Sequence, residues 1–199
     1  MSNKNPVSET RQDVVWVLGA QDPEMTAIEN LLRECDQVVV YATSDAVLYG
    51  RPGAQRVHGG NAYAATSMSE YPPDTAEYIF VECEVARMPS YIDRSRVDHH
   101  RPGDPGYGVG ASGYMAASSI GQVISRLATM GQIPDGWRRG SGPGVSPPGA
   151  VVQIDHSMVV VLDVYHDYDA GGFPVQVMIW AEIPYPLVLT AAADHCLRK

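Results

Sequence analysis

The sequence predicts an α/β protein in which a mostly parallel sheet is flanked by helices and followed by a C-terminal β-hairpin appendage. Over residues 14–41, a buried strand, an amphipathic helix and a second buried strand follow one another. This order is typical of a parallel sheet whose strands are joined by a crossover helix. Further along, two apolar segments are separated by the turn sequence Asp169–Gly172, which favours an antiparallel hairpin.

The first half of the chain supplies the parallel sheet. Residues 14–19 form a short apolar run that ends in glycine, which indicates a buried strand. A helix is predicted over 23–35, because its apolar residues recur at helical spacing and a proline stands in its first turn. Further strands are expected at 37–41 and 78–81, whereas 42–61 is rich in glycine and polar residues and is expected to be irregular.

The second half begins with a polar loop over 93–107 and continues with an amphipathic helix over 113–130. About half of residues 132–150 are glycine or proline, which indicates a linker or mobile loop. The hairpin strands and the last helix are expected at 157–165, at 175–181 and after Thr190. We therefore expect a metal-binding α/β domain, a Gly/Pro-rich linker and a small β-rich appendage packing on the same domain, over residues 1–130, 131–150 and 151–199.

Composition narrows the classes of protein. The chain has 199 residues and a formal net charge of −9, which argues against coating of duplex nucleic acid, since that needs a basic surface. Three cysteines lie far apart, so neither a disulfide framework nor a structural zinc site is expected. No signal peptide is visible, and the apolar runs are too short to span a bilayer. A cytoplasmic protein with no membrane partner is expected, and the oligomeric state is left open.

The densest polar cluster is the tripeptide Asp98-His99-His100, which Arg101 follows. One imidazole can ligate a divalent metal, the other can reach a substrate, and the carboxylate can ligate the metal or orient a ring. The alternative is a solvated loop that carries two ordinary histidines.

Acidic residues follow two of the predicted strands. Asp22 and Glu24 come just after the first strand, and Glu82 directly follows the strand at 78–81. Ligands of α/β proteins bind at this edge of the sheet, so these carboxylates and the histidines are expected to converge on Mn²⁺ or Mg²⁺. The alternatives are a helix N-cap for Asp22, with Glu24 on the helix dipole, and an ordinary strand end for Glu82.

These motifs resemble the N-terminal domain of the DHH phosphoesterases, which include RecJ-type exonucleases, oligoribonucleases, exopolyphosphatases and manganese pyrophosphatases. The family's first motif is a strand, then His-x-x-x-Asp-x-Asp, then a helix; Asp22 and Glu24 occupy its acidic positions, and Leu18 stands in place of its histidine. Glu82 takes the place of the aspartate that ends the second motif's strand. The tripeptide at 98–100 matches the third motif, which gives the family its name.

The resemblance covers residues 14–130, about two thirds of the chain. The family has a small-residue, serine-containing helix after its third motif, and 116–119 resembles it. Its further aspartate has no clear match; Asp155 and Asp194 are candidates, although Asp194 and His195 also fit a C-terminal tail. The family's second, substrate-binding domain is not evident, because only about 50 residues follow the linker.

The resemblance implies a divalent-metal-dependent phosphohydrolase that uses Mn²⁺ or Mg²⁺. A bound ion lowers the pKa of water and neutralises phosphoryl oxygens. The metal ligands are expected to be Asp22, Glu24, Glu82, Asp98 and His99. The catalytic donor and the charge clamp on the phosphate are expected to be His100 and Arg101. The expected substrate is a phosphoester or phosphoanhydride of a small nucleotide or a short single-stranded nucleic acid.

Four further residues are candidates for substrate binding. His58 and Asn61 lie in a polar-aromatic segment that could bind a sugar or base, and His58 could replace the missing histidine ligand; the alternative is an exposed loop. Gly110 belongs to a GxGxxG pattern over 108–113, but no strand directly precedes it, which disfavours a dinucleotide site. Backbone amides near Gly110 and the hydroxyl of Ser118 are predicted to bind phosphate, although 108–113 also fits a flexible loop.

Two other interpretations remain open. Because Leu18 replaces a ligand, the chain could be a non-catalytic nucleotide- or ligand-binding protein on a degenerate DHH domain. It could also be an unrelated α/β protein that carries the tripeptide by chance.

Overall fold

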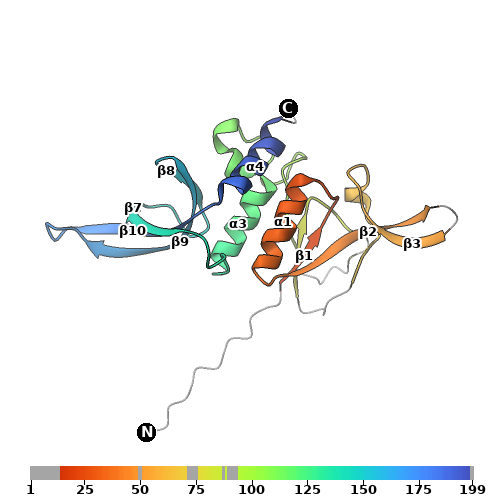
Figure 1. The fold of residues 1–199 in the computed structure, drawn as a ribbon, viewed down its shortest axis with the longest axis horizontal. Coiled ribbons are helices and arrows are strands. Elements are labelled where there is room, and N and C mark those ends of the chain that lie inside the picture. The colour runs from red at the N-terminus through yellow and green to blue at the C-terminus, as the bar shows by residue number, and fades with distance from the viewer. Residues whose placement is uncertain (1–13, 49–50, 71–75, 87, 89–93, 198–199) are drawn as a thin grey trace, which may run out of the picture.

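The protein has mixed α/β architecture, with one mostly parallel sheet, one antiparallel sheet and α-helices packed between them (Figure 1). The computed structural model describes residues 14–48, 51–70, 76–86, 88 and 94–197.

The main sheet has the order β3-β2-β1-β5-β6, and β4 pairs with β2 away from this path. The bounds of these strands are β1 Val14–Leu18, β2 Val38–Leu48, β3 Arg51–Arg56, β4 Ser67–Met68, β5 Glu77–Val81 and β6 Arg94–Val97. The strand pairs β2–β1, β1–β5 and β5–β6 are parallel, which confirms the mostly parallel sheet. Only β3 and β4 run antiparallel to their partner.

The helix α1 (Pro23–Glu34) joins β1 to β2 as the sequence predicts. Asp22 caps it, accepting a hydrogen bond from the Met25 N–H at 2.8 Å, and Pro23 occupies the first turn, where no N–H is needed. The apolar side chains of α1 at 25, 28, 31 and 32 are buried, because they share the face that meets the sheet.

The amphipathic helix expected over 113–130 is broken in two. A 3₁₀ turn, η2 (Ala111–Gly113), leads into α2 (Tyr114–Ala117), and α3 (Ser119–Thr129) follows after a break. The break is at Ser118, whose backbone is extended and whose hydroxyl accepts a hydrogen bond from the Gly121 N–H at 3.1 Å. A Cβ at Gly121 would lie only 1.6 Å from the Met115 carbonyl oxygen, so the tight corner requires glycine there.

The second sheet is antiparallel and has the order β7-β10-β9-β8. Its strands are β7 Arg139–Pro143, β8 Val151–Ile154, β9 Ser157–Tyr168 and β10 Pro174–Glu182. The pair β9–β10 forms the predicted hairpin, but the expected linker contributes a strand as well. Gly140 of this segment serves packing, since a Cβ there would lie 2.2 Å from the Trp180 ring.

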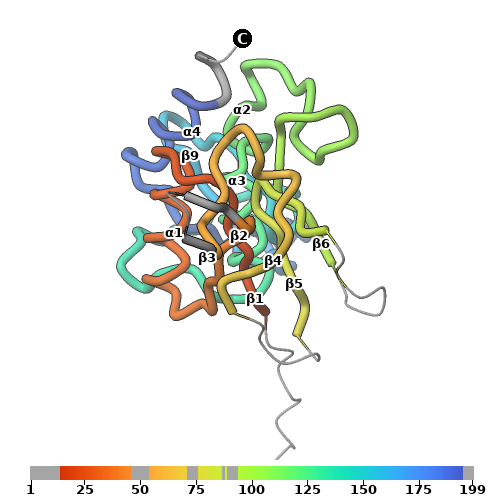
Figure 2. The backbone as a smooth tube through the Cα atoms, turned by 90° about the vertical axis from the view of Figure 1, so that its right-hand side faces the viewer, coloured from red at the N-terminus to blue at the C-terminus, as the bar shows by residue number. Residues whose placement is uncertain are grey.

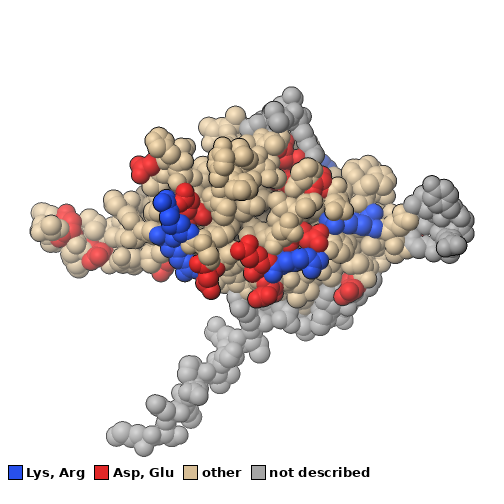
Figure 3. Space-filling model, viewed as in Figure 1, with Lys and Arg blue, Asp and Glu red and all other residues tan. Residues whose placement is uncertain are grey.

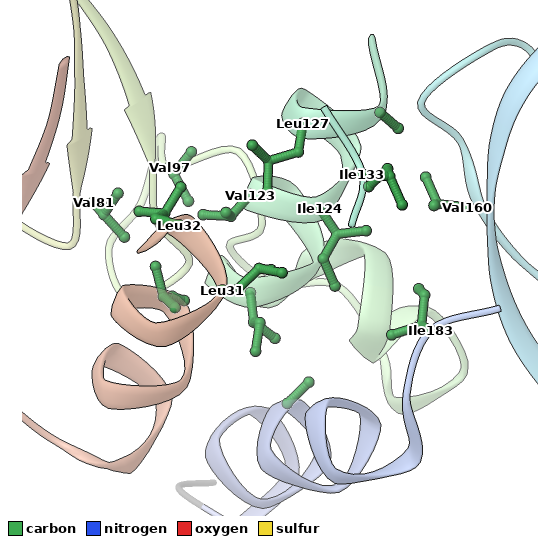
Figure 4. Packing of buried hydrophobic residues seen from close by; sticks show 14 of the residues in the cluster. Leu31, Leu32, Val81, Val97, Val123, Ile124, Leu127, Ile133, Val160 and Ile183 are labelled. Atoms are coloured by element: carbon green, nitrogen blue, oxygen red, sulfur yellow. The ribbon is translucent and has the colours of Figure 1, made fainter. Parts of the chain in front are cut away.

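The C-terminal segment shares its core with the main sheet. Helix α4 (Tyr185–Leu197) begins earlier than expected and contacts α1, α2 and α3. Figure 4 shows Val160 and Ile183 beside Ile124 of α3 in one hydrophobic cluster. Each buried aliphatic side chain there contributes about 1.5–3 kcal/mol. The segment at 151–199 therefore contributes side chains to the same hydrophobic core as the main sheet.

In the part of the chain that the structure describes, the α-helices cover one face of the main sheet. Helices α1, α3 and α4 pack in the cluster that contains Trp16 and Ile79, and Figure 2 shows α1 and α4 on the same side of the strands. Among the described residues, the cluster on the other face contains no α-helical side chain, and its members outside the strands come from loops and η1 (Ala62–Ala64). Flanking by helices is thus confirmed for one face.

Residues 42–48 and 51–56 pair as antiparallel strands, so the expectation of irregular structure over 42–61 is wrong for them. Strand β2 continues to Leu48 and pairs antiparallel with β3, from Thr43 opposite Arg56 to Leu48 opposite Arg51. The segment is polar because β3 is an edge strand, where Pro52 and charged residues are tolerated. Hydrophobic patterning therefore gave no signal for it.

The hairpin β9–β10 extends outward as an arm (Figure 1). Residues 162–176 carry Asp163, Asp167 and Asp169 but no Lys or Arg, and the space-filling view shows acidic side chains without basic ones along it (Figure 3). Across the described ranges, no helix is long and apolar enough to cross a membrane.

Candidate metal centre

Side chains from three separate segments converge at one edge of the main sheet. Glu82 follows β5, His99 and His100 follow β6, and Asp194 projects from α4. One ligand atom from each of these four lies within 4.8 Å of the others. Glu24, in the first turn of α1, joins them with its Oε2 atom 3.5 Å from His99 Nε2. Of the three carboxylates, Glu24 and Glu82 are those that the sequence predicts from their positions after strands.

Glu82 is held in a left-handed backbone conformation, with φ of 49°. Non-glycine residues adopt this region rarely, and such strain concentrates at functional sites. A Cβ at Gly19 would lie 2.5 Å from the Glu82 carbonyl oxygen, so glycine lets the end of β1 approach this residue. The Glu82 N–H donates to the Val97 carbonyl at 3.0 Å, which fixes it beside the histidine turn.

Asp98 shapes the turn that carries both histidines. Its Oδ1 accepts hydrogen bonds from the backbone N–H groups of His99 at 2.7 Å and His100 at 3.1 Å. Gly106 lies against this turn, where a Cβ would come within 2.7 Å of the His99 Cβ. Asp98 is fully buried, and its Oδ2 has no hydrogen-bond partner in the described part of the chain. Asp98 is not one of the four clustered ligands, and its binding of metal through Oδ2 stays a prediction.

His99 is surrounded by carboxylates. Its Nε2 lies 3.0 Å from Asp194 Oδ2 and 3.6 Å from Glu82 Oε1, besides the contact with Glu24. Burial by itself lowers the pKa of His99, but the hydrogen bonds to Asp194, Glu24 and Glu82 outweigh it and raise the pKa to about 11. The imidazolium is thus the positive charge that offsets the carboxylates when no metal is bound.

The carboxylates differ in their affinity for protons. Burial raises the pKa of Glu24 to about 7, although the hydrogen bond with His99 opposes this shift. Burial also acts to raise the pKa of Glu82, but His100 and then His99 outweigh it and hold that pKa well below its usual range. Hydrogen bonding to Glu82, with its Oε1 3.3 Å from His100 Nε2, raises the pKa of His100.

The donor set fits a divalent cation. Glu24 Oε2 and Glu82 Oε1 are buried, and the contacts that the structure gives them are with the imidazoles of His99 and His100, at 3.3–3.6 Å. Buried carboxylates are normally paired or bound to metal, and carboxylate oxygens with imidazole nitrogens suit Mn²⁺ and related ions. The His99 side chain is 6% exposed and that of His100 is 26% exposed, so the centre opens towards solvent on the His100 side.

A second opening lies between α1 and α4. The cavity there has a volume of about 330 Å³, and Glu24 and Asp194 are among the residues that line it. A separate cavity of about 380 Å³ lies beside β5 and β6. Pro23, Leu189 and Ala193 form the apolar part of the cavity between α1 and α4. An ion or a small group can reach the carboxylates by this route.

Two positions of the family's first motif, Asp22 and Leu18, have structural roles. Asp22 caps α1, so the N-cap alternative is confirmed for it, and its binding of metal stays a prediction. Leu18 is fully buried in the hydrophobic core, and because its side chain has no donor atom, the position that matches the family's histidine supplies no ligand.

The predicted substrate-binding residues lie in loops and caps. Asn61 Oδ1 accepts from the His58 N–H at 2.8 Å, which shapes the loop after β3, and His58 is not one of the four clustered ligands. Gly110 precedes η2, and its carbonyl accepts from the Gly113 N–H. The Ser118 hydroxyl is buried and also donates to the Met115 carbonyl, so it caps α3, and its binding of phosphate stays a prediction.

Asp194 is the residue that spacing along the sequence did not select firmly. Asp155, the other candidate for the family's further aspartate, lies in the β8–β9 turn, whereas α4 carries Asp194 to His99. The adjacent Asp-His pair at 194–195 was the only signal, and the side chain of His195 lies outside the described residues.

Fold and cluster together describe a mixed α/β protein with a candidate metal centre at the edge of its parallel sheet. No protein-family model, curated protein or solved structure matches the chain.

Proposed function

We propose that this protein is a divalent-metal-dependent phosphohydrolase of the DHH type. The observation that carries the proposal is the convergence of Glu24, Glu82 and Asp194 on His99, with His100 at the open side. The order of these residues along the chain agrees with the motif order of the DHH phosphoesterases. Asp194 supplies the further aspartate which that resemblance calls for.

The ion would be Mn²⁺ or Mg²⁺, held by Glu24, Glu82, His99 and Asp194, with the buried Oδ2 of Asp98 available in addition. When bound, the ion lowers the pKa of a water molecule and neutralises phosphoryl oxygens. His99 must hold its proton away from Nε2 to serve as a ligand. The carboxylates that contact Nε2 in this structure would then share the ion with it instead of accepting its hydrogen bond.

His100 and Arg101 would act on the substrate. His100 is the more exposed histidine, so its imidazole can donate a hydrogen bond to a phosphoryl oxygen. Arg101 is one-third exposed and follows it directly, where its guanidinium can bind the same anion. The substrate class is a phosphoester or phosphoanhydride of a small nucleotide or of a short single-stranded nucleic acid.

A metal titration tests the proposal. Isothermal calorimetry with Mn²⁺ should give one or two tight sites in the parent, and His99→Gln should weaken binding by about 10–100-fold. His166→Gln, which changes an exposed histidine on the arm, is the matched control and should bind like the parent. Equal Mn²⁺ affinity in His99→Gln and the parent would remove His99 from the centre.

An activity assay completes the test. The parent should hydrolyse bis(p-nitrophenyl) phosphate with Mn²⁺ and lose this activity in excess chelator. Tight Mn²⁺ binding without turnover of this substrate or of short oligonucleotides would favour the second candidate, a non-catalytic ligand-binding protein. The buried Leu18 at the family's histidine position is the observation that keeps this candidate.

A further inference from the structure

Tyr63, in the 3₁₀ turn η1, contacts both parts of the proposed active site. Its hydroxyl donates a hydrogen bond to Asp98 Oδ1 at 3.2 Å, and this oxygen also holds the histidine turn. Its ring supports Arg101, whose guanidinium carbon lies 3.6 Å from the ring centroid. One side chain therefore links the turn that carries the metal ligand to the cation that faces the substrate.

Other contacts hold Arg101 in place on this ring. Its backbone N–H donates to Asp104 Oδ2 at 2.7 Å, and its Nε lies 3.7 Å from the same oxygen. Nη1 lies 3.7 Å from Glu84 Oε2. The remaining nitrogen, Nη2, is buried and has no hydrogen-bond partner within the described ranges, so an anion drawn into the site would supply the partner that this donor lacks. Stacking on an aromatic face orients the planar guanidinium in a way that a lysine cannot reproduce.

The phenol stays a hydrogen-bond donor over the working pH range. Burial raises the pKa of Tyr63, and the charge of Asp98 raises it further. The hydroxyl thus remains protonated and keeps its contact with the carboxylate. Its two functions reside in different atoms, so they can be separated by substitution.

We propose that Tyr63 is a positioning residue with two roles, in which the hydroxyl orders the histidine turn and the ring orients Arg101 as the anion clamp. This inference rests on the proposed phosphohydrolase function, because it concerns the substrate of that same site. It predicts that phosphate binding depends on the ring, whereas metal binding depends on the hydroxyl.

The test uses calorimetry with two probes, Mn²⁺ and inorganic phosphate, the latter measured with and without Mn²⁺. Tyr63→Phe should weaken Mn²⁺ binding by about tenfold and change phosphate affinity less than twofold. Tyr63→Leu, which removes the ring together with the hydroxyl, should weaken both Mn²⁺ binding and phosphate binding by about tenfold. Tyr165→Leu, at a partly exposed tyrosine on the arm, should change neither affinity.

A double-mutant cycle separates positioning from general damage. Arg101→Lys should weaken phosphate binding by about tenfold, and Tyr63→Leu/Arg101→Lys should weaken it by about tenfold rather than a hundredfold, because both changes remove the same clamp. Additive losses, or parental phosphate affinity in Tyr63→Leu, would overturn the inference, as would the absence of phosphate binding in the parent. Phosphate binding that depends on Tyr63 in a protein without hydrolytic activity would refute the proposed function alone.

Discussion

Metal binding should release protons, and the number released should change across neutral pH. His99 has a raised pKa of about 11, so its Nε2 carries a proton at pH 6–8 until a metal displaces it. Glu24 has a raised pKa of about 7 and is mostly protonated at pH 6 but mostly ionised at pH 8. The protein should therefore release about two protons per Mn²⁺ at pH 6 and about one at pH 8.

The size of the effect follows from these two groups. Because His99 loses one proton to metal binding at every pH from 6 to 8, the Mn²⁺ affinity rises about 100-fold over this range. The titration of Glu24 multiplies the rise by about ten. The total of about 1000-fold corresponds to about 4 kcal/mol of binding free energy. Glu24→Gln should remove the second contribution and leave about 100-fold, while lowering the affinity at pH 8.

Calorimetry in buffers of different ionisation enthalpy measures both quantities. The heat of binding then varies with the buffer in proportion to the protons released. Mn²⁺ affinity that is constant from pH 6 to pH 8, with no dependence of the heat on the buffer, would refute this account of His99. In the metal-free protein the sign is opposite: the stability from His99 is complete below about pH 6.5 and is lost as the pH rises towards 11. Its Tm in chelator should therefore fall from pH 6 to pH 9.

Three further substitutions probe the frame of the site. Gly19→Ala places a Cβ 2.5 Å from the Glu82 carbonyl oxygen and should cost about 1–3 kcal/mol in denaturant unfolding, whereas Gly136→Ala, with open space around it, should cost under 1 kcal/mol. Asp22→Ala should lower stability by about 1 kcal/mol through the lost N-cap, and a tenfold loss of Mn²⁺ affinity in calorimetry would instead identify a ligand. Asp194→Asn should weaken Mn²⁺ by about 10–100-fold; unchanged affinity would exclude it from the centre.

Local patterns predicted the part of the site that depends on strand ends. The buried strand at 14–19 and the helix after it carry Glu24 to the sheet edge, and the strand at 78–81 carries Glu82 there. Parallel strands bring their ends to the same edge, so the convergence of Glu24 and Glu82 follows from topology. His99 reaches that edge after β6, a strand in a segment that the sequence predicts to be a polar loop.

Residues placed by long-range packing could not be predicted in this way. Asp194 reaches His99 only because α4 folds back across α1 and α3, and nothing in its local sequence specifies that path. The glycines of 131–150 resembled a linker, yet Gly140 makes room for the Trp180 ring inside a sheet. The spacing of residues in the sequence also cannot show that the Ser118 hydroxyl makes the hydrogen bonds that cap α3.

A bound ion would act as a reversible cross-link in this fold. His99 and Asp194 are 95 positions apart in the sequence, and their side chains meet at 3.0 Å. A covalent link that closes a loop of this length restricts the unfolded chain by about 4–5 kcal/mol at 25 °C in the chain-entropy treatment. A coordinated ion leaves when the chain unfolds, so it stabilises the fold by mass action instead, by about 2.7 kcal/mol at an ion concentration 100 times its Kd. Chelation would then loosen the docking of α4 on α1 before the sheet opens, and amide hydrogen exchange should rise first in that helix.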